Sequence, residues 1–177
     1  MRRVLLFVVA TLVLTAAVHL GIVWELPRFV MSKVMEKVAA GAEVNRFIEV
    51  PLATDKARGV VRPSPDLAYS ICVLDLSVGP VRISVPLTAP YTSIALYGDA
   101  TDNYFVRNDR DTGGKPLDVI VLAPGVAKPG TLPEGVDVVT APTVKGLALV
   151  RRAVESAEAF PALDAIRKTS TCAPFTG

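Results

Sequence analysis

The first long feature of the chain is an apolar run from Val4 to Trp24, which directly follows the pair Arg2-Arg3. The run is interrupted only by residues that a membrane helix tolerates, namely Thr11, Thr15, His19 and Gly21. A helix rises about 1.5 Å per residue, so a run of this length crosses a hydrocarbon core about 30 Å thick. The pattern predicts a membrane anchor at 1–25, formed by one transmembrane helix.

A cleavable signal peptide is the alternative interpretation of this run. Arg2-Arg3 form a positive segment before it, and Thr15-Ala16-Ala17 offers small residues to a peptidase. Apolar regions of signal peptides are about 7 to 15 residues long, and this run is longer, which favours an uncleaved anchor. The very short basic N-terminal tail favours an inside N-terminus and an outside C-terminal domain, although basic residues also follow the span.

A second helical pattern extends from Leu26 to Ala40. Apolar residues recur there near helical spacing, with charged residues between them: Phe29, Val30, Val34 and Val38 against Arg28, Lys33, Glu36 and Lys37. We expect a juxtamembrane amphipathic helix and a linker at 26–50. Its apolar stripe lies either on the lipid surface or against the folded domain.

From Leu67 onward the pattern changes to short β-rich runs separated by turn residues. The runs are Tyr69 to Leu76, Val81 to Val85, Thr92 to Tyr97, Tyr104 to Arg107, Leu117 to Leu122, Val136 to Thr140 and Gly146 to Arg152. Segments such as Ser77-Val78-Gly79-Pro80 and Asp111-Thr112-Gly113-Gly114 fall between them. No helix-length segment separates these strands, so the pattern favours an antiparallel sheet structure over βαβ units.

We therefore expect one mainly β (α+β) domain at 51–177, an antiparallel β-sandwich of jelly-roll-like type. A C-terminal helix is predicted at Val154 to Lys168, broken by Pro161, with Leu163 and Ile166 on one face. A domain of this length usually forms a single core.

Composition and cysteine spacing narrow the class of protein. A formal net charge of +2, without a basic cluster or aromatic ladder, argues against a nucleic-acid partner. Cys72 and Cys172 are too far apart for a CxxC motif, which leaves two buried thiols or one long-range disulfide. In an oxidising compartment such a disulfide would stabilise the fold by about 3 to 5 kcal/mol.

Several catalytic and cofactor sites are excluded by missing residues. The only histidine, His19, lies in the membrane run, where it is a tolerated passenger. A Ser-His-Asp triad, a Cys-His pair and a histidine-ligated metal are therefore excluded from the soluble domain. No GxGxxG or GxxxxGK occurs, so we expect no nucleotide cofactor. Asn108 to Asp111 resembles part of a calcium loop, but Ile120 stands at its last ligand position, which favours a solvated hairpin turn.

An ordered set of motifs resembles the bacterial proteins known as domain of unknown function 1254. The set begins with Arg62-Pro63-Ser64-Pro65-Asp66-Leu67-Ala68-Tyr69-Ser70, close to the family signature RPNPDTLYS. It continues with Asp75-Leu76-Ser77, Gly79-Pro80, Tyr91, Asp99 to Phe105, Arg110 to Gly113, Pro124-Gly125, Pro142-Thr143 and Arg151. Order and spacing agree from Pro51 to Arg152. Ser64 in place of the usual Asn, and an inserted Asp102, depart from the family pattern.

The resemblance implies a mostly β domain and, for this chain, a partner. Long members of the family continue into a second β domain, known as domain of unknown function 1214, whereas this sequence stops where that half would begin. A companion protein carrying a 1214-type domain is therefore the expected partner, at the periplasmic face of a bacterial inner membrane. The family has no established reaction, so the resemblance assigns none.

The remaining candidate chemistry is a polar pocket. Arg62, Asp66 and Tyr69 would line it together with Asp99 and Asn103, because carboxylates beside a guanidinium orient polar ligands. The alternative is that the first three residues only shape the turn before a strand, with the Tyr69 hydroxyl hydrogen bonded. We expect a non-catalytic interaction module. The alternative function is a carboxylate-based hydrolase, or a sugar-binding module, that uses the acidic residues.

Overall fold

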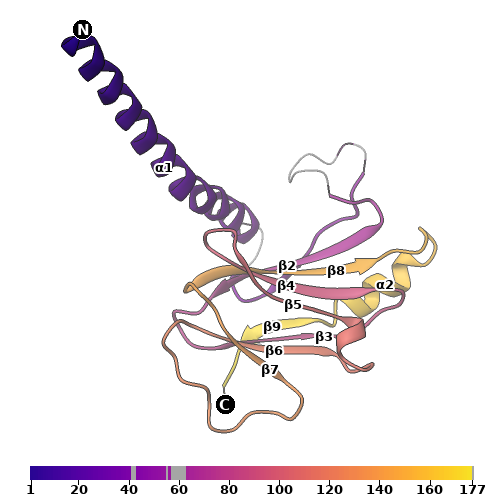
Figure 1. Ribbon diagram of the computed structural model, residues 1–177. Coiled ribbons are helices and arrows are strands. Elements are labelled where there is room, and N and C mark those ends of the chain that lie inside the picture. Colours follow the sequence, from indigo (N-terminus) through magenta and orange to yellow (C-terminus); the bar gives the residue numbers. More distant parts are fainter. Residues whose placement is uncertain (41–42, 55, 57–62, 177) are drawn as a thin grey trace.

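The N-terminal part of the chain forms one long helix. In the computed structural model, which describes residues 1–40, 43–54, 56 and 63–176, α1 extends over Arg2–Ala39 and projects away from the β domain (Figure 1). Within these residues it is the helix long and apolar enough to cross a membrane. The sequence pattern predicted a separate juxtamembrane helix, but the two segments are continuous. Pro27 lies inside α1 without ending it, because the residues on both sides of it have a helical pattern.

The β strands form two sheets. Sheet 1 has the order β1-β2-β8-β4-β5, from strands Phe47–Glu49, Leu67–Asp75, Lys145–Ala153, Thr92–Gly98 and Asn103–Asn108. Sheet 2 has the order β7-β6-β3-β9, from strands Asp137–Thr140, Leu117–Leu122, Val81–Val85 and Thr171–Pro174. The expected mainly β (α+β) class is confirmed. One pair departs from the antiparallel prediction, since β6 and β7 are parallel.

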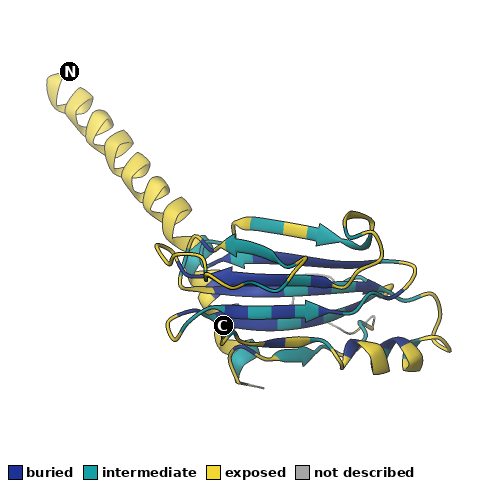
Figure 2. Cartoon of the chain, turned by 90° about the horizontal axis from the view of Figure 1, so that it is seen from below, coloured by how far each residue is buried: buried dark blue, intermediate teal, exposed yellow. Residues whose placement is uncertain are grey.

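The hydrophobic core lies between the two sheets (Figure 2). Alternate residues of β3 are fully buried, as are the inward residues of β8, which is the period expected when one face of a strand meets the core. Leu74 and Ile94 of sheet 1 and Ile83 of sheet 2 are among the largest buried side chains. Together these residues form one continuous cluster, so the two sheets share a single core.

A disulfide crosses this core. Cys72 of β2 is bonded to Cys172 of β9, with 6.6 Å between the Cα atoms. Both cysteines are buried. Of the two states that the sequence left open, the structure contains the long-range disulfide, which joins sheet 1 to the last strand of sheet 2.

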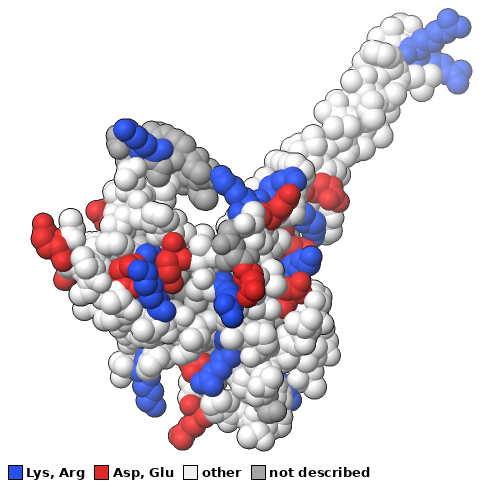
Figure 3. Space-filling view, turned by 180° about the vertical axis from the view of Figure 1, so that it is seen from behind, with Lys and Arg blue, Asp and Glu red and all other residues white. Residues whose placement is uncertain are grey.

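The last turns of α1 pack on the outer face of sheet 1. Met31 and Met35 are buried there against Val73 of β2 and Leu147 of β8. Of the predicted apolar stripe, Val34 and Val38 pack against the domain, whereas Phe29 and Val30 remain exposed. In Figure 3 the helix shows uncharged surface between its basic N-terminal tip and the charged residues at the domain, as expected of a membrane-spanning segment.

A short helix, α2, closes the opposite end of the sheets (Figure 1). It extends over Phe160–Arg167, and Pro161 lies in its first turn. The predicted C-terminal helix is confirmed, but it starts at Phe160 and not at Val154, and Pro161 begins the helix where the sequence pattern predicted a break. Proline is favoured at the start of a helix because its missing N–H has no intrahelical partner there.

Candidate functional site

The residues predicted to form a polar pocket are not gathered in one place. Asp66 immediately precedes Leu67 of β2, which pairs with Ala153 of β8. Asp99 immediately follows Gly98 of β4, which pairs with Gly146. Seven residues of β8 separate these two positions, or about 23 Å at 3.3 Å per residue. Asp66 and Asp99 therefore lie at opposite ends of sheet 1 and cannot act on one ligand.

Three of the candidates start or flank β2. The Tyr69 hydroxyl accepts a hydrogen bond of 3.1 Å from the backbone N–H of Ser64, as expected of a tyrosine that shapes the turn before a strand. Asp66 is exposed, and its carbonyl accepts a bond of 2.9 Å from the N–H of Val154. Arg62 lies outside the described residues. The described part of this motif has a structural role.

Asn103 holds the irregular start of the β4–β5 hairpin. Its side-chain amide donates to the carbonyls of Leu96 at 3.1 Å and Phe105 at 3.4 Å, where the register shifts between Leu96 and Tyr97. The next residue, Tyr104, is mostly buried, and burial raises the pKa of its hydroxyl, with a smaller contribution from Asp102. Asn103 is therefore a structural residue of the hairpin.

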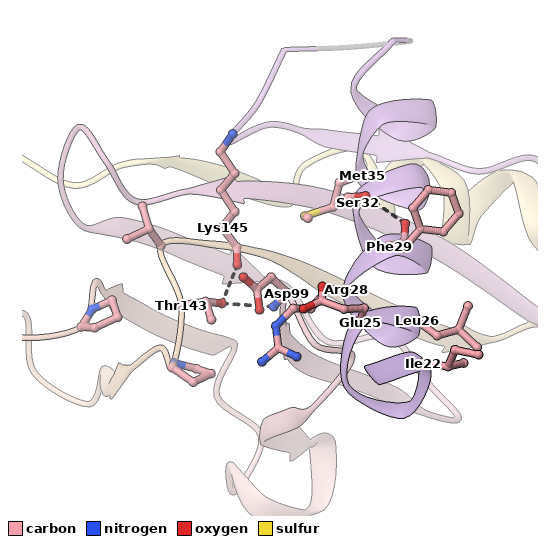
Figure 4. A pocket seen from close by; sticks show the side chains of 13 residues that line it. Ile22, Glu25, Leu26, Arg28, Phe29, Ser32, Met35, Asp99, Thr143 and Lys145 are labelled. Carbon is pink, nitrogen blue, oxygen red and sulfur yellow. Dashed lines mark hydrogen bonds between the residues drawn. The ribbon is translucent and has the colours of Figure 1, made fainter. Parts of the chain in front are cut away.

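Asp99 lies in a large groove between α1 and the β domain. We call it the junction groove, because α1 forms one wall and the loops at the adjacent end of the two sheets form the other (Figure 4). Its volume is about 1070 Å³. It is lined by Ile22, Glu25, Leu26, Arg28, Phe29, Ser32 and Met35 of α1, and by Asp99, Pro124, Pro142, Thr143, Val144 and Lys145 of the domain.

The domain wall of the junction groove is held by Thr143. Its hydroxyl accepts a hydrogen bond of 3.1 Å from the N–H of Asp99 and donates one of 2.7 Å to the carbonyl of Lys145 (Figure 4). Beside it, β4 and β8 approach closely. A Cβ on Gly146 would come within 2.5 Å of the Tyr97 carbonyl oxygen, so glycine is required there. These contacts fix the position of Asp99.

Charged groups of both signs meet in the junction groove. Glu25 and Arg28 extend from α1, and Asp99 and Lys145 from the domain. Among the described residues, none of the four forms an ion pair within 4.0 Å. One Asp99 oxygen, Oδ1, is buried with no hydrogen-bond partner in the described structure. An unsatisfied buried oxygen is costly, which marks it as a place for a donor.

A second groove lies at the other end of the domain, beside α2. This α2 groove has a volume of about 290 Å³ and is mainly apolar, lined by Leu87, Thr88, Ala89, Ala153, Val154, Glu155, Ala159, Ala162, Leu163 and Ile166. Ile166 is 42% exposed, although the opposite side of α2 is packed on the domain. Ile166 therefore leaves apolar surface accessible in this groove, whereas Leu163 beside it is buried.

Two arginines are buried close to α2. Arg167 forms an ion pair of 3.1 Å with Glu49 and hydrogen bonds to the carbonyls of Val50 and Tyr69. Arg152 is fully buried on the inner face of β8, and burial lowers the pKa of its guanidinium to about 10. These residues hold the end of the fold together and do not open into either groove.

The Asn108–Asp111 segment is not a calcium loop in the described structure, and it is not a hairpin turn. Asp109–Asp111 form a 3₁₀ helix whose cap is reciprocal: Arg110 N–H donates to the Asn108 side chain, and Asn108 N–H donates to Asp111. The segment connects β5 of sheet 1 to β6 of sheet 2. The Asp111 carboxylate therefore helps to shape a crossing between the sheets. No cluster of metal-ligating side chains occurs in the described residues.

Sequence reasoning missed the helix side of the junction groove. Glu25 was not considered, and Arg28 was interpreted only as a flanking charge. The available signal was the recurrence of Ile22, Leu26 and Phe29 every three to four residues, which continues one face of the apolar run past its end. Lys145 and the end of β8 carried no signal, because only the sheet register brings them beside Asp99.

Comparisons with known proteins identify a family and a fold. Residues 44–174 match the family described as "Protein of unknown function (DUF1254)". No curated protein matches the sequence. The crystal structure of the VPA0106 protein from Vibrio parahaemolyticus is similar over 86% of this chain and 36% of its own, with 16% identity and a TM-score of 0.68. An uncharacterized protein from Burkholderia cenocepacia shares 17% identity over 69% of this chain and 35% of its own, with a TM-score of 0.49. The chain spans about a third of either solved chain.

Proposed function

Because the chain belongs to the DUF1254 family, whose description names no activity, we propose its function from its geometry: a membrane-anchored, non-catalytic interaction module. The module lies on the periplasmic side of a bacterial inner membrane. Its partner is a companion subunit that carries a 1214-type β domain. The α2 groove receives that subunit.

Two features support the proposed location. α1 offers an apolar segment long enough for one membrane span, with Arg2 and Arg3 at its N-terminal tip. The Cys72–Cys172 disulfide belongs to proteins of oxidising compartments, because cytosolic reductants keep thiols reduced. A chain with its N-terminus inside and its disulfide-bonded domain outside satisfies both features.

The separation of the acidic residues favours a binding module over the alternative hydrolase. A pair of carboxylates acts on a glycosidic bond when the two groups are about 5 to 9.5 Å apart. Asp66 and Asp99 lie at opposite ends of β8, several times that distance from each other. The alternative therefore loses the pair of Asp66 and Asp99, and of its acidic residues only Asp99 and Asp102 remain close to each other in the chain.

The observation that carries the proposal is the exposed apolar surface of the α2 groove. The groove lies at the end of the sheets away from α1, so a partner reaches it without competing with the membrane. In the VPA0106 protein the shared fold accounts for about a third of the chain, so a domain of this fold is followed or preceded there by further structure. A separate subunit would supply such structure here.

The test is a pull-down of tagged full-length protein from native membranes in mild detergent, without reductant, followed by mass spectrometry. We expect one companion with a 1214-type domain at a stoichiometric ratio. Ile166→Glu and Ala162→Glu place a charge in the α2 groove and should reduce recovery of the companion at least about tenfold, because a charge cannot be buried unpaired.

The matched control is Val78→Glu, which makes a similar change at a valine that is 79% exposed in the turn after β2, away from the α2 groove. It should leave recovery unchanged. The proposal fails if no companion is recovered, or if the groove variants, folded by circular dichroism, retain it as well as the control does.

A further inference from the structure

The junction groove begins where the apolar run of α1 ends. Ile22, Leu26 and Phe29 lie on one face of the helix, and each is more than half exposed. Trp24 and Arg28 stack on each other on another side of the same turns, with the guanidinium carbon 4.5 Å from the ring centroid. Tryptophan and arginine at this position are typical of the boundary between acyl chains and headgroups. The groove thus opens at headgroup depth.

Two opposite charges face each other across the groove. Figure 4 shows Asp99 directed from the domain toward the side of α1 that carries Arg28. Arg28 uses one N–H in a bond of 2.7 Å to the Trp24 carbonyl, which leaves further donors of its guanidinium for another group. Asp99 Oδ1 is buried without a donor in the described structure. The groove therefore has a carboxylate residue, Asp99, on one wall and guanidinium donors of Arg28 on the other.

A zwitterionic headgroup matches this arrangement. It needs a carboxylate for its cation and a guanidinium for its phosphate diester, and the apolar face of Ile22 and Leu26 suits its acyl chains. A primary ammonium can donate N–H hydrogen bonds to the Asp99 carboxylate, which lines the groove, whereas a quaternary ammonium has no N–H to donate. An anionic headgroup without a cation would leave Asp99 unpaired.

We propose that the junction groove binds a phosphatidylethanolamine, with its ammonium on Asp99, its phosphate on Arg28 and an acyl chain along Ile22, Leu26 and Phe29. The site lies at the opposite end of the domain from the α2 groove. Lipid binding in the junction groove can therefore be tested independently of partner binding in the α2 groove.

The test is native mass spectrometry of the full-length protein, released from detergent in an equimolar mixture of phosphatidylethanolamine, phosphatidylcholine and phosphatidylglycerol. We expect the ethanolamine lipid to be retained about tenfold more than the other two, the ratio that corresponds to about 1.4 kcal/mol. Asp99→Asn should remove the preference over phosphatidylcholine. Arg28→Gln should reduce retention of both zwitterionic lipids.

Asp66→Asn is the matched control, because it makes the same change at an exposed aspartate at the far end of sheet 1. It should retain the full preference. Equal retention of the three lipids, a preference for phosphatidylglycerol, or an undiminished ethanolamine preference in Asp99→Asn would each overturn the proposal. If Asp99 only faced Arg28 and did not bind the lipid ammonium, the protein would retain the ethanolamine and choline lipids equally, with or without the Asp99→Asn substitution.

Discussion

Arg152 and Arg167 are both buried near α2, yet their surroundings differ. Arg167 has Glu49 and Asp164 as carboxylate partners. Arg152 donates only through Nη2, to the Pro86 carbonyl and the Ser170 hydroxyl, while its Nε and Nη1 have no partner in the described structure. Arg167 is therefore compensated for its loss of hydration, and Arg152 is compensated only in part.

We expect opposite consequences when each arginine is replaced by methionine, which keeps an unbranched chain of similar length. Arg167→Met should lower the free energy of unfolding by about 3 kcal/mol, since it removes the ion pair from the partly buried Glu49 carboxylate and leaves only the Ser70 hydrogen bond. Arg152→Met should change it by less than about 1 kcal/mol, because the lost bonds are offset by removal of two unsatisfied donors. Chemical denaturation of the detergent-solubilised protein, followed by circular dichroism, measures both values. Equal losses in the two variants would contradict this assignment.

The sequence contains little information about these roles. Arg151 and Arg152 are adjacent and identical in type, and only the alternation of a β strand decides that Arg152 faces the core. The partner of Arg167, Glu49, lies in a three-residue strand near the start of the domain. No local pattern links two residues so far apart in the chain.

At the scale of elements, strands with a regular pattern were predicted closely. Val81–Val85 and Leu117–Leu122 have the predicted bounds, because each alternates or is continuously apolar between clear turn residues. β1 and β9 were missed, since three or four residues are too few to show a period. The parallel pairing of β7 was also unpredictable, because pairing direction depends on the path of the 123–136 connection.

α2 gives a prediction for acidic pH. A hydrogen bond from Lys168, with a smaller contribution from Arg167, holds the pKa of Asp164 below its usual 3.8. A carboxylate with a lower pKa in the folded state stabilises the fold above its unfolded pKa, and this contribution is lost as pH falls through the folded pKa. The protein should therefore lose stability below about pH 4.

Asp164→Asn should lower the unfolding temperature at pH 7 and make the remaining decrease below pH 4 shallower. Asp75 should keep part of that decrease, since hydrogen bonds from Ser77 also lower its pKa. Thermal unfolding of both proteins between pH 3 and pH 7 gives the comparison. A variant whose profile parallels that of the wild type would show that Asp164 is not responsible.

At the scale of the whole molecule, the disulfide has the largest single expected effect. Cys72 and Cys172 are separated by 100 residues, and closing a loop of that length restricts the unfolded chain by about 4 to 5 kcal/mol. The double variant Cys72→Ala, Cys172→Ala should lose about this amount in denaturant titrations. Added reductant should destabilise the wild type under unfolding conditions and leave the double variant unchanged. Equal stability of the two proteins would contradict the expected contribution.

The predicted polar pocket is not formed because of how the whole molecule is arranged. Each of its residues was well placed in its own motif, but the motif at Asp66 starts β2 and the motif at Asp99 follows β4. Both strands pair with β8, and their register sends the two motifs to opposite ends. Sequence motifs gave the family and the mainly β class, whereas the grooves depend on how α1 and α2 meet the sheets.

Because α1 is continuous, its apolar N-terminal segment is coupled mechanically to the β domain. The segment that suits a bilayer and the segment docked through Met31 and Met35 belong to one helix, so a change in helix tilt is transmitted directly to sheet 1. Apolar helices stand more upright in thicker bilayers and tilt in thinner ones. With α1 spanning a bilayer as proposed, we expect the angle of the sheets to the membrane, and with it the height of α2 above the lipid, to change with bilayer thickness.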